Sequence, residues 1–237
     1  MTNPTLKAFE TLHPPRFSEA TATHHGTTLK TFLTLAAVVA GAVVTWNLPM
    51  GLALLLGMGG LVLGLILALV TVFRPKSAPF TALPYGFCEG LLLGFLTSLL
   101  ESLYPLIGLQ AGLITLALFA VTLAAYQAGW LRATPGFLQG MQIAVGAVML
   151  VYLVGFLGSF WGWQIPYIHE GGIVGIAFSG VVITIATLTL VVDFHIIDQA
   201  VAQQAPRHME WYGAFALTVT LVWMYIEVLH LLSKVRE

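Results

Sequence analysis

Long apolar stretches separated by short polar segments make up the chain from residue 29 onward. Residues 31–73 contain no charged residue, and this length suffices for two membrane crossings of about 20 residues each. The turn signal Asn47-Leu48-Pro49 separates the two crossings. Residues 102–131, 133–169 and 171–192 are further uncharged runs. The pattern predicts seven transmembrane helices, near residues 29–47, 50–73, 82–101, 106–128, 137–160, 171–193 and 208–233.

The composition agrees with a protein embedded in a lipid bilayer. Of the 237 residues, 58% are hydrophobic and 8% are charged, whereas a soluble domain carries about 25% charged residues. So few charges exclude a soluble globular domain, a disordered chain and a coiled coil. Nine Lys and Arg against ten Asp and Glu leave no basic surface, so no nucleic-acid partner is expected. The single cysteine, Cys88, excludes a disulfide framework. We therefore expect an all-α integral membrane protein.

The basic residues indicate the orientation in the membrane. Before residue 210 they all fall in the N-terminal tail, at the very start of the first span or in alternate loops, which the positive-inside rule places in the cytoplasm. Residues 1–28 are then a cytoplasmic N-terminal tail, and residues 29–237 form the seven-helix transmembrane domain. We expect the last segment to cross fully, although two basic residues follow it. The basic residues in question are Lys7, Arg16, Lys30, Arg74, Lys76, Arg132 and Arg207, followed by Lys234 and Arg236.

Glycines recur at four-residue spacing within several predicted helices. The third span contains Gly86, Gly90 and Gly94, and the second contains Gly60 and Gly64. Small residues at this spacing allow helix backbones to approach closely in lipid. The pattern fits packing inside one chain or a seam between two copies, so a monomer and a small homo-oligomer both stay open.

Ionisable residues inside predicted spans are candidates for function, because each costs about 2.5–3.5 kcal/mol to insert. Glu89 lies beside the glycines of the third span, and we expect it to face a neighbouring helix. Asp193 ends the sixth span, and Glu227 lies in the seventh with His230 one turn later. Arg74 closes the second span, and we expect it to pair with Asp193. The alternatives are a snorkelling Arg74 and an Asp193 that is an ordinary charge at a helix end.

No enzyme motif accompanies these residues. His169-Glu170 lacks the second histidine of a zinc-binding HExxH helix, and no serine lies in a Gly-x-Ser-x-Gly elbow. The loop residues His195, Asp198 and His208 are a weak candidate for metal binding near Asp193. We expect a protein that is not an enzyme and that carries no resident cofactor.

Two segments resemble the Bax inhibitor-1 family. Asp193-Phe194-His195-Ile196-Ile197 resembles the Tyr-Asp-x-x-x-Ile stretch after the family's sixth span. Met224-Tyr225-Ile226-Glu227-Val228-Leu229 resembles its Leu-Tyr-Leu-Asp-Phe-Ile motif, with Glu in place of Asp. Residues 87–90 and 209–215 are similar to a bacterial branch, the Bax inhibitor-1/YccA-like proteins. The agreement in span spacing extends over about residues 30–233.

This resemblance implies a fold of six helices around a central, polar seventh. It implies a pH-sensitive calcium leak across a membrane, here the bacterial plasma (inner) membrane, with calcium as the transported ion. The family's proton-sensitive acidic pair maps onto Asp193 and Glu227, which would also bind calcium weakly, and its latching arginine maps onto Arg74. The 34-residue separation of Asp193 and Glu227 is longer than the family's usual spacing. Direct contact and two different depths in the membrane both stay open.

A second function class competes with the leak. A small, tight bundle with little soluble mass also fits a non-transporting regulator or an accessory subunit. The partner would be a membrane protein complex, for example a membrane-anchored AAA protease.

Overall fold

The computed structural model describes residues 21–161 and 172–236, and seven long helices account for nearly all of them. Each is long and apolar enough to cross a membrane, which confirms the predicted seven-span architecture. A short 3₁₀ turn, η1 (Pro75–Ser77), joins the second helix to the third. The helices are α2 (His24–Trp46), α3 (Met50–Phe73), α4 (Ala78–Glu101), α5 (Ile107–Gln127), α6 (Pro135–Ser159), α7 (Ile173–Ala202) and α8 (His208–Arg236).

Two helices differ clearly from their predicted bounds. Helix α2 begins at His24 instead of near residue 29, because Thr23 caps it by accepting a hydrogen bond from the backbone of Gly26. Helix α7 continues nine residues beyond Asp193. Asp193 therefore does not end a helix but lies within one, and the interpretation of Asp193 as an ordinary helix-end charge is wrong.

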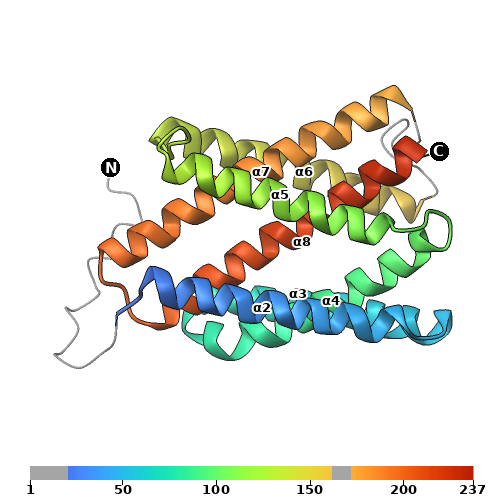
Figure 1. Cartoon of the computed structure of the whole chain (residues 1–237), viewed down its shortest axis with the longest axis horizontal. Coiled ribbons are helices and arrows are strands. Elements are labelled where there is room, and N and C mark those ends of the chain that lie inside the picture. Colours follow the sequence, from blue (N-terminus) through green and yellow to red (C-terminus); the bar gives the residue numbers. More distant parts are fainter. Residues whose placement is uncertain (1–20, 162–171, 237) are drawn as a thin grey trace.

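Helix α8 occupies the centre of the bundle. In Figure 1 it runs obliquely between α2, α3 and α4 on one side and α5, α6 and α7 on the other. It packs directly against α2, α4, α5 and α7. Its side chains Met224, Val228 and Leu229 are almost completely buried, beside Leu190 of α7. This arrangement is the expected one of six helices around a central seventh.

Polar contacts also converge on α8, although its surroundings are mostly apolar. The hydroxyls of Thr34 and Thr218 lie 2.8 Å apart and join α2 to α8. The hydroxyls of Thr97 and Tyr225 are also 2.8 Å apart and join α4 to α8. Because helices in lipid gain little from burying apolar surface against each other, such hydrogen bonds help to specify which helices meet.

The glycines of α4 lie against α2. A Cβ added at Gly86 would lie 2.7 Å from the carbonyl oxygen of Thr34, and one at Gly90 would collide with the backbone of Val38. On another face of α4, a Cβ at Gly60 of α3 would lie 2.5 Å from the carbonyl oxygen of Cys88. These two glycine series therefore serve close packing within one chain, the first of the two predicted roles.

Helix α8 spans the whole bundle. Its 29 residues extend over about 43 Å, which exceeds the roughly 30 Å of a bilayer core. At its far end the Arg236 guanidinium donates to Oε1 of Gln110, 2.5 Å away, at the start of α5. The last segment therefore has the length and the contacts of a full crossing.

Candidate functional site

Asp193 lies buried between α7 and the central helix. Its side chain is nearly inaccessible, and its Oδ2 accepts a 2.6 Å hydrogen bond from the hydroxyl of Thr220 on α8. Within residues 21–161 and 172–236, no basic side chain forms an ion pair with it. A buried carboxyl group with a hydroxyl as its partner can exchange a proton or bind a cation without first breaking an ion pair.

Glu227 lies further along α8 than Thr220, and it contacts α6 instead of α7. Its Oε1 accepts hydrogen bonds from the hydroxyl of Tyr152 on α6, at 2.5 Å, and from the indole nitrogen of Trp223, at 3.1 Å. Glu227 follows Thr220 by seven residues, or about 10 Å along the helix axis. The two carboxyl groups therefore lie at different depths, which was the second of the two predicted arrangements.

The expected ion pair between Arg74 and Asp193 is not formed. Arg74 is exposed at the end of α3, immediately before η1. Helix α3 packs mainly against α4, whereas α7 packs against α8 and α5. The turn η1 that follows Arg74 packs against α8 and α4, and α7 lies on α8, so the prediction of this pair is wrong.

Glu89 contacts a neighbouring helix, as predicted. A Cβ added at Gly64 would lie 3.0 Å from Oε1 of Glu89, so the half-buried carboxyl group lies over the glycine surface of α3. Tyr85 interacts with it from one turn earlier on α4.

His230 is exposed on the surface of α8. His169 and Glu170, which lack the second histidine of a zinc-binding helix, lie outside the described residues.

A buried ion pair at the start of the bundle escaped the sequence analysis. Lys30 of α2 forms a salt bridge and a hydrogen bond with Glu210 of α8, and both side chains are buried. The backbone nitrogen and the hydroxyl of Thr23 each donate to Oε1 of Glu210 at 2.9 Å. Nε of Arg207 lies 3.7 Å from Oε2 of Glu210, and Nζ of Lys30 lies 5.4 Å from the ring centre of Trp211. Lys30 and Glu210 are 180 positions apart, so no local pattern links them.

The comparisons with known proteins identify the family. A family model described as Bax inhibitor 1 like matches residues 3–237, nearly the whole chain. The chain belongs to the Bax inhibitor 1 like family. Searches of curated proteins and of solved structures found no match.

The contacts of Asp193 differ from the expected acidic pair of Asp193 and Glu227. The residue on α8 that contacts Asp193 is Thr220, 27 positions later. Glu227 contacts Tyr152 of α6 instead.

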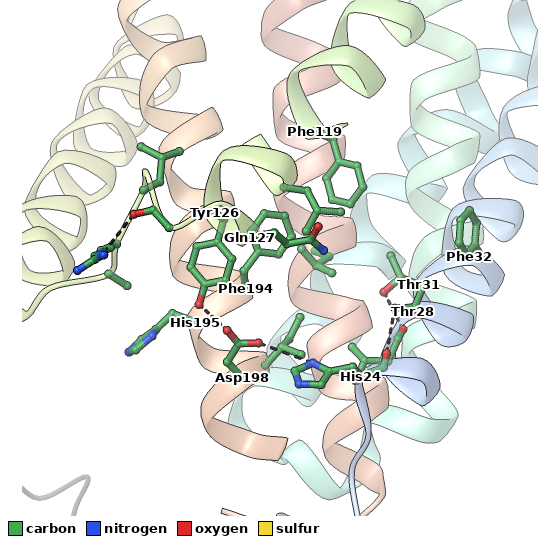
Figure 2. Close-up of a pocket in the computed structure, with 18 of the residues that line it drawn as sticks. His24, Thr28, Thr31, Phe32, Phe119, Tyr126, Gln127, Phe194, His195 and Asp198 are labelled. Atoms are coloured by element: carbon green, nitrogen blue, oxygen red, sulfur yellow. Dashed lines mark hydrogen bonds and ion pairs between the residues drawn. The ribbon is translucent and has the colours of Figure 1, made fainter. Parts of the chain in front are cut away.

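A cavity of about 860 Å³ opens beside this region, between α2, α5 and α7. Figure 2 shows Asp198 of α7 at its polar end, between Tyr126 and His24. The Tyr126 hydroxyl donates to Oδ2 of Asp198 at 2.6 Å, and Nδ1 of His24 lies 3.7 Å from Oδ1. Phe194, the residue after Asp193, forms part of the wall. The cavity and the buried aspartate thus lie on two faces of one helix turn.

The predicted metal ligands do not gather into a cluster. Among the residues that the structure places, no three His, Cys, Asp or Glu side chains lie close enough to hold one ion. The ring of His195 instead lies 3.0 Å from the amide nitrogen of Gln199. A cation at Asp193 or Glu227 would therefore have one carboxyl group, with hydroxyl, carbonyl and water oxygens as its other ligands.

Proposed function

We propose that this protein is a cation leak of the membrane, with calcium as the transported ion and with a conductance that depends on pH. The observation that carries the proposal is the buried Asp193, which pairs with the hydroxyl of Thr220 on the central helix. A proton and a cation compete for the same carboxyl oxygens. Acidification should therefore lower the calcium conductance, and higher pH should raise it.

The geometry favours two separate carboxyl sites over one acidic pair. Asp193 with Thr220, and Glu227 with Tyr152, each combine one carboxyl group with one hydroxyl. Calcium prefers six to eight oxygen ligands, so each site would bind it weakly. Weak binding at successive sites is what conduction requires, because the ion must leave as readily as it enters.

Several finer features belong to the same proposal. The protein would be non-enzymatic, would carry no resident cofactor and would lie in a bacterial inner membrane with its N-terminus in the cytoplasm. Arg74 has no part as a latch, because its side chain is exposed and makes no ion pair with Asp193 in the described residues.

Calcium flux into liposomes tests the proposal. The purified chain is reconstituted with a calcium dye inside the vesicles, and flux is measured at several pH values. Flux of the natural sequence should rise with pH, and Asp193→Asn and Glu227→Gln should each remove that dependence. Both changes keep the shape of the side chain and remove its titration. Glu101→Gln is the matched control for Asp193→Asn, because Glu101 lies at the opposite end of the bundle and accepts hydrogen bonds from the backbone nitrogens of Leu106 and Gly108.

Two results would contradict the leak. Unchanged pH dependence in both variants would remove Asp193 and Glu227 from the mechanism. Absence of flux in the natural sequence at every pH would favour the alternative, a non-transporting regulator or accessory subunit of a membrane complex such as a membrane-anchored AAA protease.

A further inference from the structure

The cavity between α2, α5 and α7 has a polar end and an apolar interior. Its lining on α2 extends from His24 to Leu35, which is about 16 Å along the helix. The polar end lies where α2 begins and where α5 and α7 end, at the level of the short segment that joins α5 to α6. Its volume of about 860 Å³ is within the range of pockets that bind small organic ligands.

The interior is lined by apolar side chains from four helices. Phe194 and Leu217 are buried, and Phe119 and Leu123 of α5 and Leu35 of α2 also line it. Figure 2 shows Phe119 and Phe194 on this inner side and Phe32 at the opposite wall. The threonine hydroxyls of α2 in this lining already donate to carbonyl oxygens one turn earlier, so a hydrocarbon chain can occupy this part without displacing their partners.

The polar end holds charges of both signs. Asp198 is fixed by the Tyr126 hydroxyl on one oxygen, and its other oxygen lies on the side of His24. Arg132, from the segment that follows α5, also lines the cavity. Its Nε donates to the carbonyl oxygen of Gly129 at 3.1 Å, which orients the guanidinium and leaves its terminal nitrogens for other acceptors. One anion and one cation at the mouth of an apolar cavity complement a zwitterionic headgroup.

We propose that this cavity binds a membrane phospholipid with a primary ammonium headgroup, of the phosphatidylethanolamine class. The ammonium contacts the carboxylate of Asp198, the phosphate contacts Arg132, and an acyl chain lies along Leu35, Phe119 and Leu123. Tyr126 acts as a positioning residue that holds Asp198 in place. The inference is independent of the proposed leak, because it concerns lipid bound at a different face of α7.

Native mass spectrometry of the full chain provides the test. Delipidated protein in mild detergent is titrated with 1-palmitoyl-2-oleoyl phosphatidylethanolamine or with the phosphatidylglycerol that has the same chains. Both lipids carry a phosphate, and only the first carries an ammonium. We expect one ethanolamine lipid to bind about fivefold more tightly than the glycerol lipid, as one partly exposed ion pair would give.

Four variants assign the contacts. Asp198→Asn should lower the affinity for the ethanolamine lipid about fivefold and leave the affinity for the glycerol lipid unchanged. Arg132→Gln should weaken both lipids, because both present a phosphate. Leu123→Trp should weaken both by filling the apolar part. Glu101→Gln, with the same loss of charge at the far end of the bundle, should change neither.

Equal binding of the two lipids by the natural sequence would overturn the proposal. Equal loss of both lipids in Asp198→Asn, with an unchanged unfolding temperature, would also overturn it. If Asp198→Asn fails to fold, Leu123→Trp and the comparison of the two lipids on the natural sequence still decide. Neither measurement uses ion flux, so failure of the leak and failure of the lipid site are distinguishable.

Discussion

The hydroxyl of Thr220 donates a 2.6 Å hydrogen bond to Oδ2 of Asp193, and this bond joins α7 to the central helix α8. Both side chains are buried. The resemblance predicted Glu227 as the partner of Asp193, whereas the structure places the hydroxyl of Thr220 there. Glu227 lies about two turns further along α8 and contacts α6 through Tyr152.

Removing the Thr220 hydroxyl should destabilise the bundle. Thr220→Val keeps the shape of the side chain and leaves the buried carboxyl group of Asp193 without its donor. A buried polar group that loses its partner costs about 1–3 kcal/mol. Thermal unfolding in detergent should show this loss for Thr220→Val and little change for Thr220→Ser, which retains the hydroxyl. Equal stability of the two variants would mean that the bond contributes nothing.

The ion pair of Lys30 and Glu210 should be strongly coupled. Lys30→Met leaves the carboxylate of Glu210, in α8, buried without its cation. Thr23 is then its remaining close donor. Removing one partner of a buried pair costs about 3–5 kcal/mol. The double variant Lys30→Met, Glu210→Gln should lose clearly less than the two single losses combined. Strict additivity in this double-mutant cycle would contradict a direct interaction.

Replacement by alanine should change the free energy of unfolding differently at two glycines whose surroundings differ. Gly90 lies against the backbone of Val38, so a methyl group there forces α2 and α4 apart, at a cost of about 1–3 kcal/mol. Gly112 of α5 has nothing within 4 Å of its would-be Cβ. Gly112→Ala should be neutral or stabilising by up to about 1 kcal/mol, because alanine favours helix. Unfolding in detergent compares the two variants, and equal effects would refute the close approach of α2 and α4.

The orientation in the membrane can be tested by labelling single cysteines in a Cys88→Ala background. A cysteine at Lys76 should react with an impermeant reagent from the cytoplasmic side, because the basic loops lie there. A cysteine at Asn47 or at Arg236 should react only from the opposite side. Reaction of the Asn47 position from the cytoplasm would reverse the predicted topology. Reaction of Arg236 from the same side as Lys76 would instead show that α8 does not cross.

The sequence by itself determined the number of spans and the residues worth attention. A bilayer core has no water to bind the backbone, so each long apolar stretch is expected to be helical, and the seven predicted spans correspond to seven helices. The cost of inserting an ionisable group singled out Glu89, Asp193 and Glu227 in the same way. The glycine spacing of α4 likewise indicated close packing before any partner was known.

Only the tertiary structure decided which side chains meet. Membrane-spanning helices are apolar on nearly all sides, so the sequence carries no amphipathic stripe that says which face of α7 lies against α8. The pairing of Asp193 with Thr220 and that of Lys30 with Glu210 depend on helix rotations and crossings set by packing over the whole bundle. For the same reason Arg74 and Asp193, which are close in a diagram of spans, form no ion pair. Seven helices of similar length can pack in many arrangements, and close glycine packing with a few buried hydrogen bonds selects one of them.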